Sequence, residues 1–263
     1  MYKRPHLPYA GEFTHLQEYR DFQSGEYLGQ IDEFGDPPSR QIHRVDLLDV
    51  LIKDRIPPSV VNMGKRLLSI QSKSEGAAYK LFFADDTTAE ADIVIGCDGI
   101  KSKVRENMGI TDHPKYSGQV VYRGYVAYDD LRPKTGEMLR RVINFRGHRK
   151  HILNLPIGND ESKSAQVGVI GFMTEPLENW TSESWLARAP IDDLAAHVSN
   201  WCLEVQDIIS GLRKGSPDGK MLKQVLYVRD PTSTWFQIHE SRPDCGIILV
   251  GDSVHSTLPH QGM

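Results

Sequence analysis

Two segments of the chain share a pattern that strongly limits the fold: a short apolar run followed closely by glycine and aspartate. The first is ADIVIGCDGIKSKVR at residues 91–105, and the second is GIILVGDSVHSTLPHQG at residues 246–262. Short apolar runs bounded by acid and glycine are typical of strands that are buried on both faces of a parallel sheet. Residues 90–98 and 246–252 are therefore expected to be strands of one sheet, with both motif loops on the same side. Ligands of such sheets bind beyond the carboxyl ends of the strands, which is where both loops would lie.

The residue types in these loops suit a ligand that carries hydroxyl groups. A carboxylate such as Asp98 or Asp252 can accept hydrogen bonds from a sugar or ribityl chain, and Gly99 or Gly251 lets the backbone approach the ligand closely. The alternative is that each aspartate only caps the helix that follows it. For either motif alone both interpretations stay open, but the two together, separated by a β-rich insert, favour a ligand site.

The residues that precede and follow the first motif predict short local elements. Residues 1–40 are polar and only weakly periodic, whereas residues 45–52 have apolar side chains at helical spacing and predict a helix. Two strands are expected on either side of a turn at Gly76. A short helix after the first motif should end at Gly109.

The middle of the chain changes from helical to strand periodicity. Residues 119–174 and 222–238 predict a mostly antiparallel sheet and a second domain. Between them, Pro190–Leu212 predicts one long helix, with Pro190 at its start and an apolar stripe that should pack against the sheet. We expect Val198 and Val205 of this stripe to be buried.

The two motifs, together with the segment IHRVDLLDVL at residues 42–51, resemble motifs of the single-component FAD-dependent aromatic hydroxylases, and most closely the salicylate-hydroxylase-like branch. In this family the helix resembling residues 42–51 carries an arginine that reaches the flavin, the Asp-Gly motif serves FAD and NAD(P)H binding, and the aspartate of the Gly-Asp motif binds the ribityl chain. The resemblance therefore implies these cofactor-binding residues: Arg44, Asp98, Gly99, Gly251, Asp252, Pro259 and Gly262.

The fold implied by the resemblance is an α/β fold in which an FAD-binding parallel sheet is interrupted by an antiparallel β-sheet substrate domain. The expected domains are a partial FAD-binding domain at residues 1–115, a substrate domain with its packing helix at residues 116–240, and a return to the FAD-binding domain at residues 241–263. The family normally opens with a strand, the fingerprint G-x-G-x-x-G and a helix. No two glycines of this chain are separated by one residue, so the first βαβ unit is predicted to be missing, and the family also continues beyond the point where this sequence stops.

The resemblance implies an FAD-dependent monooxygenase that uses NADPH or NADH and molecular oxygen to hydroxylate a small phenolic or salicylate-like molecule. The alternative is a truncated, non-catalytic remnant that binds FAD weakly or not at all. Related fungal monooxygenases carry an arginine in a strand that faces the active site, and Arg123 is the candidate for this catalytic role. Some relatives also have a tyrosine before a proline further along, where this chain has Leu155 before Pro156. Otherwise Arg123 is a sheet-surface arginine in a salt bridge.

Composition and spacing point away from several other classes of protein. The formal net charge of −4 gives no sign of nucleic-acid or anionic-membrane binding. The three cysteines, Cys97, Cys202 and Cys245, form no C-x-x-C pair, and no histidine motif of a metal site occurs, so no metal is expected. We expect a cytoplasmic protein; the sequence does not predict an oligomeric state.

Overall fold

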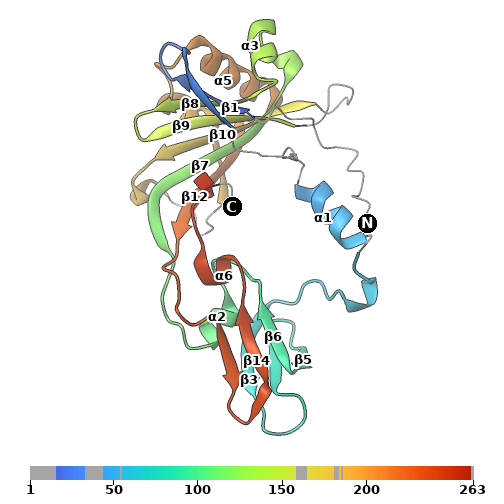
Figure 1. The fold of residues 1–263 in the computed structure, drawn as a ribbon. Helices are drawn as coiled ribbons and strands as arrows, with labels where there is room; N and C mark the ends of the chain where they lie inside the picture. Colours follow the sequence, from blue (N-terminus) through green and yellow to red (C-terminus); the bar gives the residue numbers. More distant parts are fainter. Residues whose placement is uncertain are drawn as a thin grey trace. The chain divides into compact units, whose positions relative to one another are not determined.

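The computed structural model describes residues 16–32, 44–53, 55–157, 165–180, 184 and 186–261. The chain divides into two compact units (Figure 1). Unit 1 comprises Met1–Ile56 and Gly118–Val225, and unit 2 comprises Pro57–Ser117 and Leu226–Met263.

Unit 1 is built on a sheet of eight strands. In sheet order the strands are β11 Leu186–Pro190, β12 Lys220–Val228, β7 Lys115–Ala127, β10 Gln166–Thr174, β9 Lys150–Ile157, β8 Val142–Gly147, β1 Leu16–Asp21 and β2 Tyr27–Asp32. The consecutive neighbours β7, β10, β9 and β8 pair antiparallel, as do β11 with β12 and β1 with β2, whereas β1 pairs with β8 in parallel.

The predicted antiparallel sheet is confirmed for residues 119–174 and 222–228, but it is wrong for residues 236–238. Strand β13 (Phe236–His239) belongs to unit 2, where it forms an antiparallel pair with the strand that directly follows it. A short connection brings successive strands together at little entropic cost, so this local pairing is favoured over a return to the distant sheet. Strands β1 and β2, from the weakly periodic start of the chain, were not predicted.

Two helices, not one, follow β11. Helix α4 (Ile191–His197) ends before a turn, and α5 (Leu203–Gly215) begins after it, so the predicted single helix Pro190–Leu212 is wrong. The backbone groups at the break find partners outside a continuous helix. The N–H of Cys202 donates to the carbonyl of Phe22 at 2.8 Å, and Nε2 of Gln206 donates to the carbonyl of Val198 at 2.7 Å.

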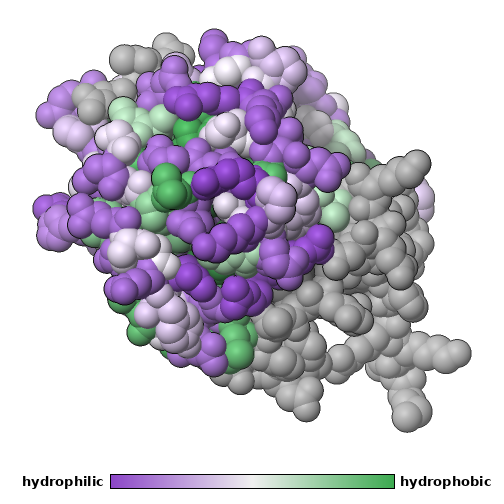
Figure 2. Space-filling model, turned by 90° about the horizontal axis from the view of Figure 1, so that it is seen from above, coloured by the Kyte–Doolittle hydropathy of each residue, from purple (hydrophilic) through white to green (hydrophobic). Residues whose placement is uncertain are grey.

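The predicted apolar stripe of this region is buried in spite of the break. Its members are at most 4% exposed: Ile191, Leu194, Val198, Trp201, Val205, Ile208 and Leu212. A Cβ atom added at Gly124 of β7 would lie 2.7 Å from Cδ2 of Leu212, which shows how closely α5 approaches the sheet. The buried stripe gives α4 and α5 the amphipathic pattern of a layer that covers a sheet. Seen from above, the described surface of the molecule is mainly hydrophilic (Figure 2).

Replacing Leu212 with alanine is expected to lower the free energy of unfolding by about 2–5 kcal/mol, because it leaves a cavity between α5 and β7. Leu203→Ala is the matched control: this leucine lies on the same helix but is 68% exposed, so a change of about 0.5 kcal/mol or less is expected. Urea unfolding followed by tryptophan fluorescence measures both. Equal small changes would contradict the close packing of α5 on the sheet.

The other helices of unit 1 are short. They are α1 Arg44–Lys53, α3 Pro133–Met138 and the 3₁₀ turns η2 Tyr128–Asp130 and η3 Leu177–Asn179. Helix α1 confirms the prediction for residues 45–52. No helix in the described part of either unit is long and apolar enough to cross a membrane.

Unit 2 contains two three-stranded sheets and short helices. One sheet has the order β3 (Leu67–Ser72), β4 (Tyr79–Phe83), β5 (Thr88–Ala91), and the other has the order β13, β14 (Arg242–Leu249), β6 (Ile93–Gly96). The predicted hairpin turn is confirmed, with Gly76 at φ +72°. The helices are α2 Lys103–Asn107, α6 Asp252–His255, η1 Pro58–Val60 and η4 Pro259–Gln261, and Gly109 follows α2 as predicted, at φ +80°.

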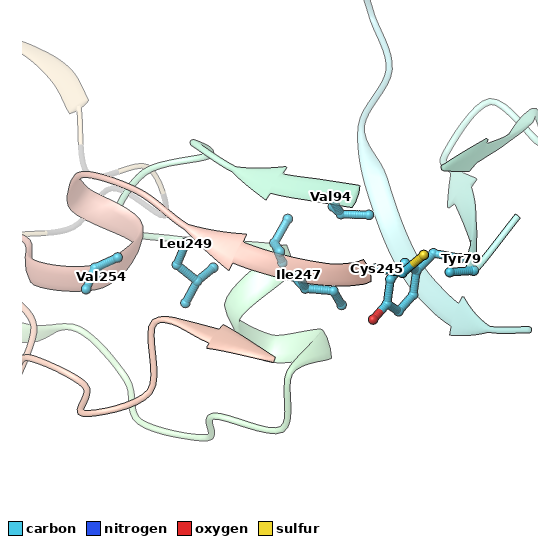
Figure 3. Close-up of a cluster of buried hydrophobic side chains, with 8 residues drawn as sticks. Tyr79, Val94, Cys245, Ile247, Leu249 and Val254 are labelled. Carbon is cyan, nitrogen blue, oxygen red and sulfur yellow. The ribbon is translucent and has the colours of Figure 1, made fainter. Parts of the chain in front are cut away.

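The core of unit 2 lies on one side of the sheet that contains β6 and β14. Figure 3 shows side chains of both strands, among them Val94, Ile247 and Leu249, in one cluster with Tyr79 from β4. The opposite side is open: Ile93 and Ile95 of β6 are 54% and 59% exposed. The prediction that β6 is buried on both faces is therefore wrong, because no described element packs on that side.

Candidate functional site

The two motif strands lie side by side in one sheet. Strands β6 and β14 pair in parallel, with Gly246 opposite Ile93 and Leu249 opposite Gly96. Their carboxyl ends therefore lie at the same edge, which confirms the expectation for residues 93–96 and 246–249. Residues 90 and 91 instead end β5, in the other sheet of unit 2.

Both motif loops turn through a glycine with a left-handed backbone. Gly99 has φ +77° and Gly251 has φ +68°, a region that side chains with a Cβ atom rarely adopt. A Cβ atom added at either glycine would meet nothing within 4 Å, so the backbone conformation and not local crowding requires glycine here. The same open space leaves the backbone of both loops free to approach a ligand.

The two aspartates have different roles in this structure. Oδ2 of Asp98 accepts hydrogen bonds from the N–H groups of Lys103 at 2.7 Å and Val104 at 3.2 Å, so Asp98 does cap α2. Asp252 is exposed and begins α6, whose cap residue is Gly251, without a side-chain cap. No described residue donates a hydrogen bond to the Asp252 carboxylate. The capping interpretation is therefore right for one oxygen of Asp98 and wrong for Asp252.

Ser253, which the sequence reasoning missed, joins the ends of the two strands. Its side chain is fully buried, and Oγ donates to the carbonyl of Gly96 at 2.7 Å and accepts from the N–H of Val250 at 3.1 Å. A Cβ atom at Gly96 would lie 2.8 Å from Cβ of Val104, so only glycine fits beside α2. The only sequence signal for Ser253 is its position directly after Asp252.

No contact of the described residues links the remaining predicted cofactor-binding residues to these loops. Arg44 is the exposed first residue of α1 and belongs to unit 1, so its approach to the motif loops stays a prediction. Pro259 begins η4 in unit 2, seven residues after Asp252 in the chain. Gly262 lies outside the described residues.

Arg123 lies on the side of the unit 1 sheet that faces away from α5. Its neighbour Gly124 faces Leu212 of α5, and successive residues of a strand point to opposite sides. Nε of Arg123 is buried and has no hydrogen-bond partner among the described residues. Burial lowers the pKa of its guanidinium group from its ordinary value.

Other polar and aromatic groups share this side of the sheet with Arg123. The register places Arg123, Ile170, Leu153 and Asn144 in one row across four strands. Oδ1 of Asn144 is also buried without a partner in the described part of the chain. Two residues further along these strands, in the next row on the same side, the rings of His151 and Phe172 stack with their centroids 4.4 Å apart. This side therefore combines stacked rings with buried polar atoms that have no partner among the described residues, a combination found in ligand-binding sites.

The family of the chain follows from a match to a known protein-family model. The model described as "FAD binding domain" matches residues 20–263, which is most of the chain. The chain belongs to this FAD-binding domain family. The match includes both motif loops and the whole described sheet of unit 1 except the start of β1.

Several curated relatives of this FAD-binding domain protein are FAD-dependent monooxygenases that act on aromatic compounds. The chain is 31% identical over 266 residues to 6-methylsalicylate 1-monooxygenase atA of Aspergillus terreus, with 95% of this chain and 54% of that protein covered. It is 28% identical over 265 residues to a salicylate hydroxylase of Pseudomonas putida, with 93% and 55% covered. The chain thus spans about half the length of these curated relatives.

Solved structures of other proteins share the fold of this chain. A substrate complex of salicylate hydroxylase aligns with a TM-score of 0.77 at 24% identity, over 97% of this chain and 62% of that one. HpxO of Klebsiella pneumoniae, solved with FAD and uric acid, aligns with a TM-score of 0.71 at 22% identity, over 97% of this chain and 60% of that one. At these identities the likeness establishes the fold of the FAD-binding domain protein.

Proposed function

We propose that the two motif loops of unit 2 bind FAD, and that the protein uses NADH or NADPH and molecular oxygen to hydroxylate a small phenolic or salicylate-like molecule. The observation that carries the proposal is the shared carboxyl edge of β6 and β14: the loops that follow turn at Gly99 and Gly251, and Asp252 offers a carboxylate that has no donor among the described residues. Ligands of parallel sheets bind at such edges.

The residues at this edge fit the hydroxyl-rich part of FAD. The Asp252 carboxylate is exposed and can accept hydrogen bonds from ribityl hydroxyls. Asp98 uses Oδ2 for α2 and leaves Oδ1 without a donor among the described residues. The open left-handed turns at Gly99 and Gly251 allow close approach of the backbone.

FAD, when bound, supplies the redox chemistry of the hydroxylation, and the protein supplies binding, orientation and exclusion of water. In this proposal unit 2 carries the FAD-binding domain and the sheet of unit 1 carries the substrate domain. Arg123 and the stacked ring of Phe172 would orient the aromatic substrate. Because FAD supplies the chemistry, the proposed reaction does not require a pair of catalytic carboxylates from the protein.

Two observations favour the second candidate, a remnant with weak FAD binding. The chain contains no G-x-G, and β6 is an edge strand of its sheet in the described part of unit 2. We propose that the first βαβ unit, which would hold the pyrophosphate and cover the open side of β6, is the part that this chain lacks. Losing two charge-assisted hydrogen bonds of about 1.5–3 kcal/mol each would weaken binding by about a hundredfold to ten-thousandfold.

Titration of FAD fluorescence distinguishes these candidates. The chain should bind FAD, but far more weakly than a chimera that carries the βαβ unit of a salicylate hydroxylase relative ahead of it. Equal, tight binding by both proteins would show that the fingerprint matters little. Absence of binding by both would reject the FAD proposal and leave the aspartates with structural roles only.

For Arg123 we expect a role in binding a negatively charged substrate. The chain should bind salicylate more tightly than its neutral methyl ester, and Arg123→Gln should weaken salicylate binding by about tenfold to a hundredfold, the value of one charge-assisted hydrogen bond. Equilibrium dialysis of both ligands measures the preference. Arg188→Gln is the control, since Arg188 is an exposed arginine of unit 1 paired with Asp218. An unchanged preference in Arg123→Gln would contradict this role.

A further inference from the structure

Two buried arginines of unit 2 share one carboxylate. Arg105 of α2 is 1% exposed, and Arg229, directly after β12, is 4% exposed. Nε of Arg105 donates to Oδ1 of Asp112 at 3.0 Å, and Nε of Arg229 donates to Oδ2 at 2.9 Å. We refer to Arg105, Asp112 and Arg229 as the arginine cluster.

The first arginine reaches from one motif to the other. Arg105 closes the Asp-Gly motif in sequence, and its Nη1 donates to the carbonyls of Ser253 at 3.0 Å and Val254 at 2.8 Å. Both carbonyls belong to α6, which Asp252 begins. Its Nη2 donates to the carbonyl of Asp230 at 3.2 Å. One side chain thereby fixes α2 and the Gly-Asp loop to each other.

The second arginine holds the Asp-Gly loop from the other side. Nη1 of Arg229 donates to the carbonyl of Ile100 at 2.6 Å, directly after Gly99, and Nη2 donates to the carbonyl of Asp112. The forked guanidinium group suits this arrangement, because it can hold a carboxylate and several carbonyls in fixed directions. A lysine at either position could not make the same set of bonds.

The charges of the cluster make it rigid. Burial raises the pKa of Asp112, but hydrogen bonds from Arg229 and Arg105 outweigh burial and keep the pKa below its ordinary value of 3.8. The carboxylate therefore stays ionised between two guanidinium groups. Separating one charged side chain of the arginine cluster from the others would leave charges without a counterion, so the observed geometry of the cluster is strongly favoured.

We propose that Arg105 and Arg229 are positioning residues that set the separation of the two motif loops, so that both loops meet one ligand. The proposal rests on the function proposed above, in which that ligand is FAD. The arginines act through the backbone: their acceptors include Ile100 in one loop and Ser253 and Val254 in the other. Neither side chain needs to touch the ligand.

Hydrogen exchange tests the positioning role without any ligand. In Arg105→Lys the amides of Ser102, Val250 and Val254 should exchange about tenfold faster or more, while the β4 amides stay unchanged. If this variant does not fold, Asp112→Asn replaces it, since Asp112 is partly exposed and the arginines keep their carbonyl partners. Faster exchange throughout unit 2 would mean a general structural role and would overturn the proposal.

Arg242→Lys is the matched control. Arg242 also joins a carboxylate and a carbonyl, with Nη1 3.0 Å from Oδ1 of Asp92 and 2.7 Å from the carbonyl of Gly76, but it lies at the opposite end of β14 from the motif loops. Its replacement should leave the exchange of the loop amides unchanged. Loop exchange as fast as in Arg105→Lys would overturn the proposal.

FAD titration of the same variants completes the test. The dissociation constant for FAD should rise about tenfold or more in Arg105→Lys and Asp112→Asn and stay unchanged in Arg242→Lys. If the unaltered chain binds no FAD but its loops still respond in the exchange experiment, the FAD proposal fails and the positioning of the loops stands. If the folded variants show neither faster loop exchange nor weaker FAD binding, the positioning proposal fails.

Discussion

FAD binding should weaken by about tenfold to a hundredfold when Asp252 is replaced by asparagine. The structure leaves the Asp252 carboxylate exposed and without a donor among the described residues, so the charge is available for a ligand and not used by the fold. Hydrogen bonds to a charged group contribute about 1.5–3 kcal/mol, which corresponds to this range of affinity. Titration of FAD fluorescence against the unaltered chain and the variant measures the change.

Two further measurements make this result specific. Asp244→Asn removes an exposed carboxylate near the start of β14, the end of the strand opposite the Gly-Asp loop, and should not change FAD affinity. Thermal unfolding should be the same for Asp252→Asn and the unaltered chain, because no described contact of the fold is lost. Unchanged FAD affinity in Asp252→Asn, with intact binding by the unaltered chain, would contradict the assignment of this aspartate to the cofactor.

The second large effect is expected at a buried acid of unit 1. Glu175 is 6% exposed, and its carboxylate accepts hydrogen bonds from the hydroxyl of Tyr122 at 2.7 Å and from Nζ of Lys223 at 2.6 Å. Nε2 of His197 lies 2.9 Å from the same carboxylate. Tyr122 and Lys223 are themselves buried. The Tyr122 hydroxyl therefore depends on Glu175 for a hydrogen-bond acceptor, and the Lys223 ammonium group depends on it for a counterion.

Glu175→Gln should lower the free energy of unfolding at neutral pH by about 3–5 kcal/mol, because Lys223 is left as a buried charge without its counterion. Glu137→Gln is the control: Glu137 pairs with Arg140 at the surface and is 81% exposed, so the change should be about 0–1 kcal/mol. Urea unfolding followed by tryptophan fluorescence measures both, with Trp201 reporting on unit 1. A loss below about 1 kcal/mol in Glu175→Gln would contradict the dependence of Lys223 on this carboxylate.

The same carboxylate makes stability depend on pH. Burial raises the pKa of Glu175, but hydrogen bonds from His197, Lys223 and Tyr122 outweigh burial and lower the pKa from 4.5 to about 2. Burial also raises the pKa of Tyr122, as does Glu175, so the tyrosine stays a donor throughout this range. Because the folded-state pKa is depressed, the stabilisation is complete above pH 4.5 and is lost as the pH falls toward 2.

The pH dependence is measured as a difference between two proteins. The stability difference between the unaltered chain and Glu175→Gln should be constant above about pH 5 and should shrink as the pH falls from there to about 2. Glu137→Gln should show no such change in its difference. A constant difference for Glu175→Gln across this window would mean that the carboxylate does not carry a depressed pKa.

The sequence by itself determined the features that depend on neighbouring residues. The strands β6 and β14, the glycines that turn after them, and the hairpin at Gly76 were all predicted, because a strand-length apolar run and a left-handed turn depend on neighbouring residues. The apolar stripe of α4 and α5 was predicted for the same reason. The motif residues also carried the resemblance that the family match confirmed.

Only the tertiary structure determined the hydrogen bonds between residues that lie far apart in the sequence. Arg105 and Ser253 are 148 positions apart, and no pattern of spacing predicts that a guanidinium group of one motif holds the backbone of the other. Likewise, the break between α4 and α5 depends on the carbonyl of Phe22, which accepts from Cys202. Asp98 and Asp252 look equivalent in sequence, yet only Asp98 caps a helix: it lies five residues before Lys103, where α2 begins, whereas Asp252 is itself the first residue of α6. Such distinctions arise from long-range packing and hydrogen bonding, which local periodicity does not contain.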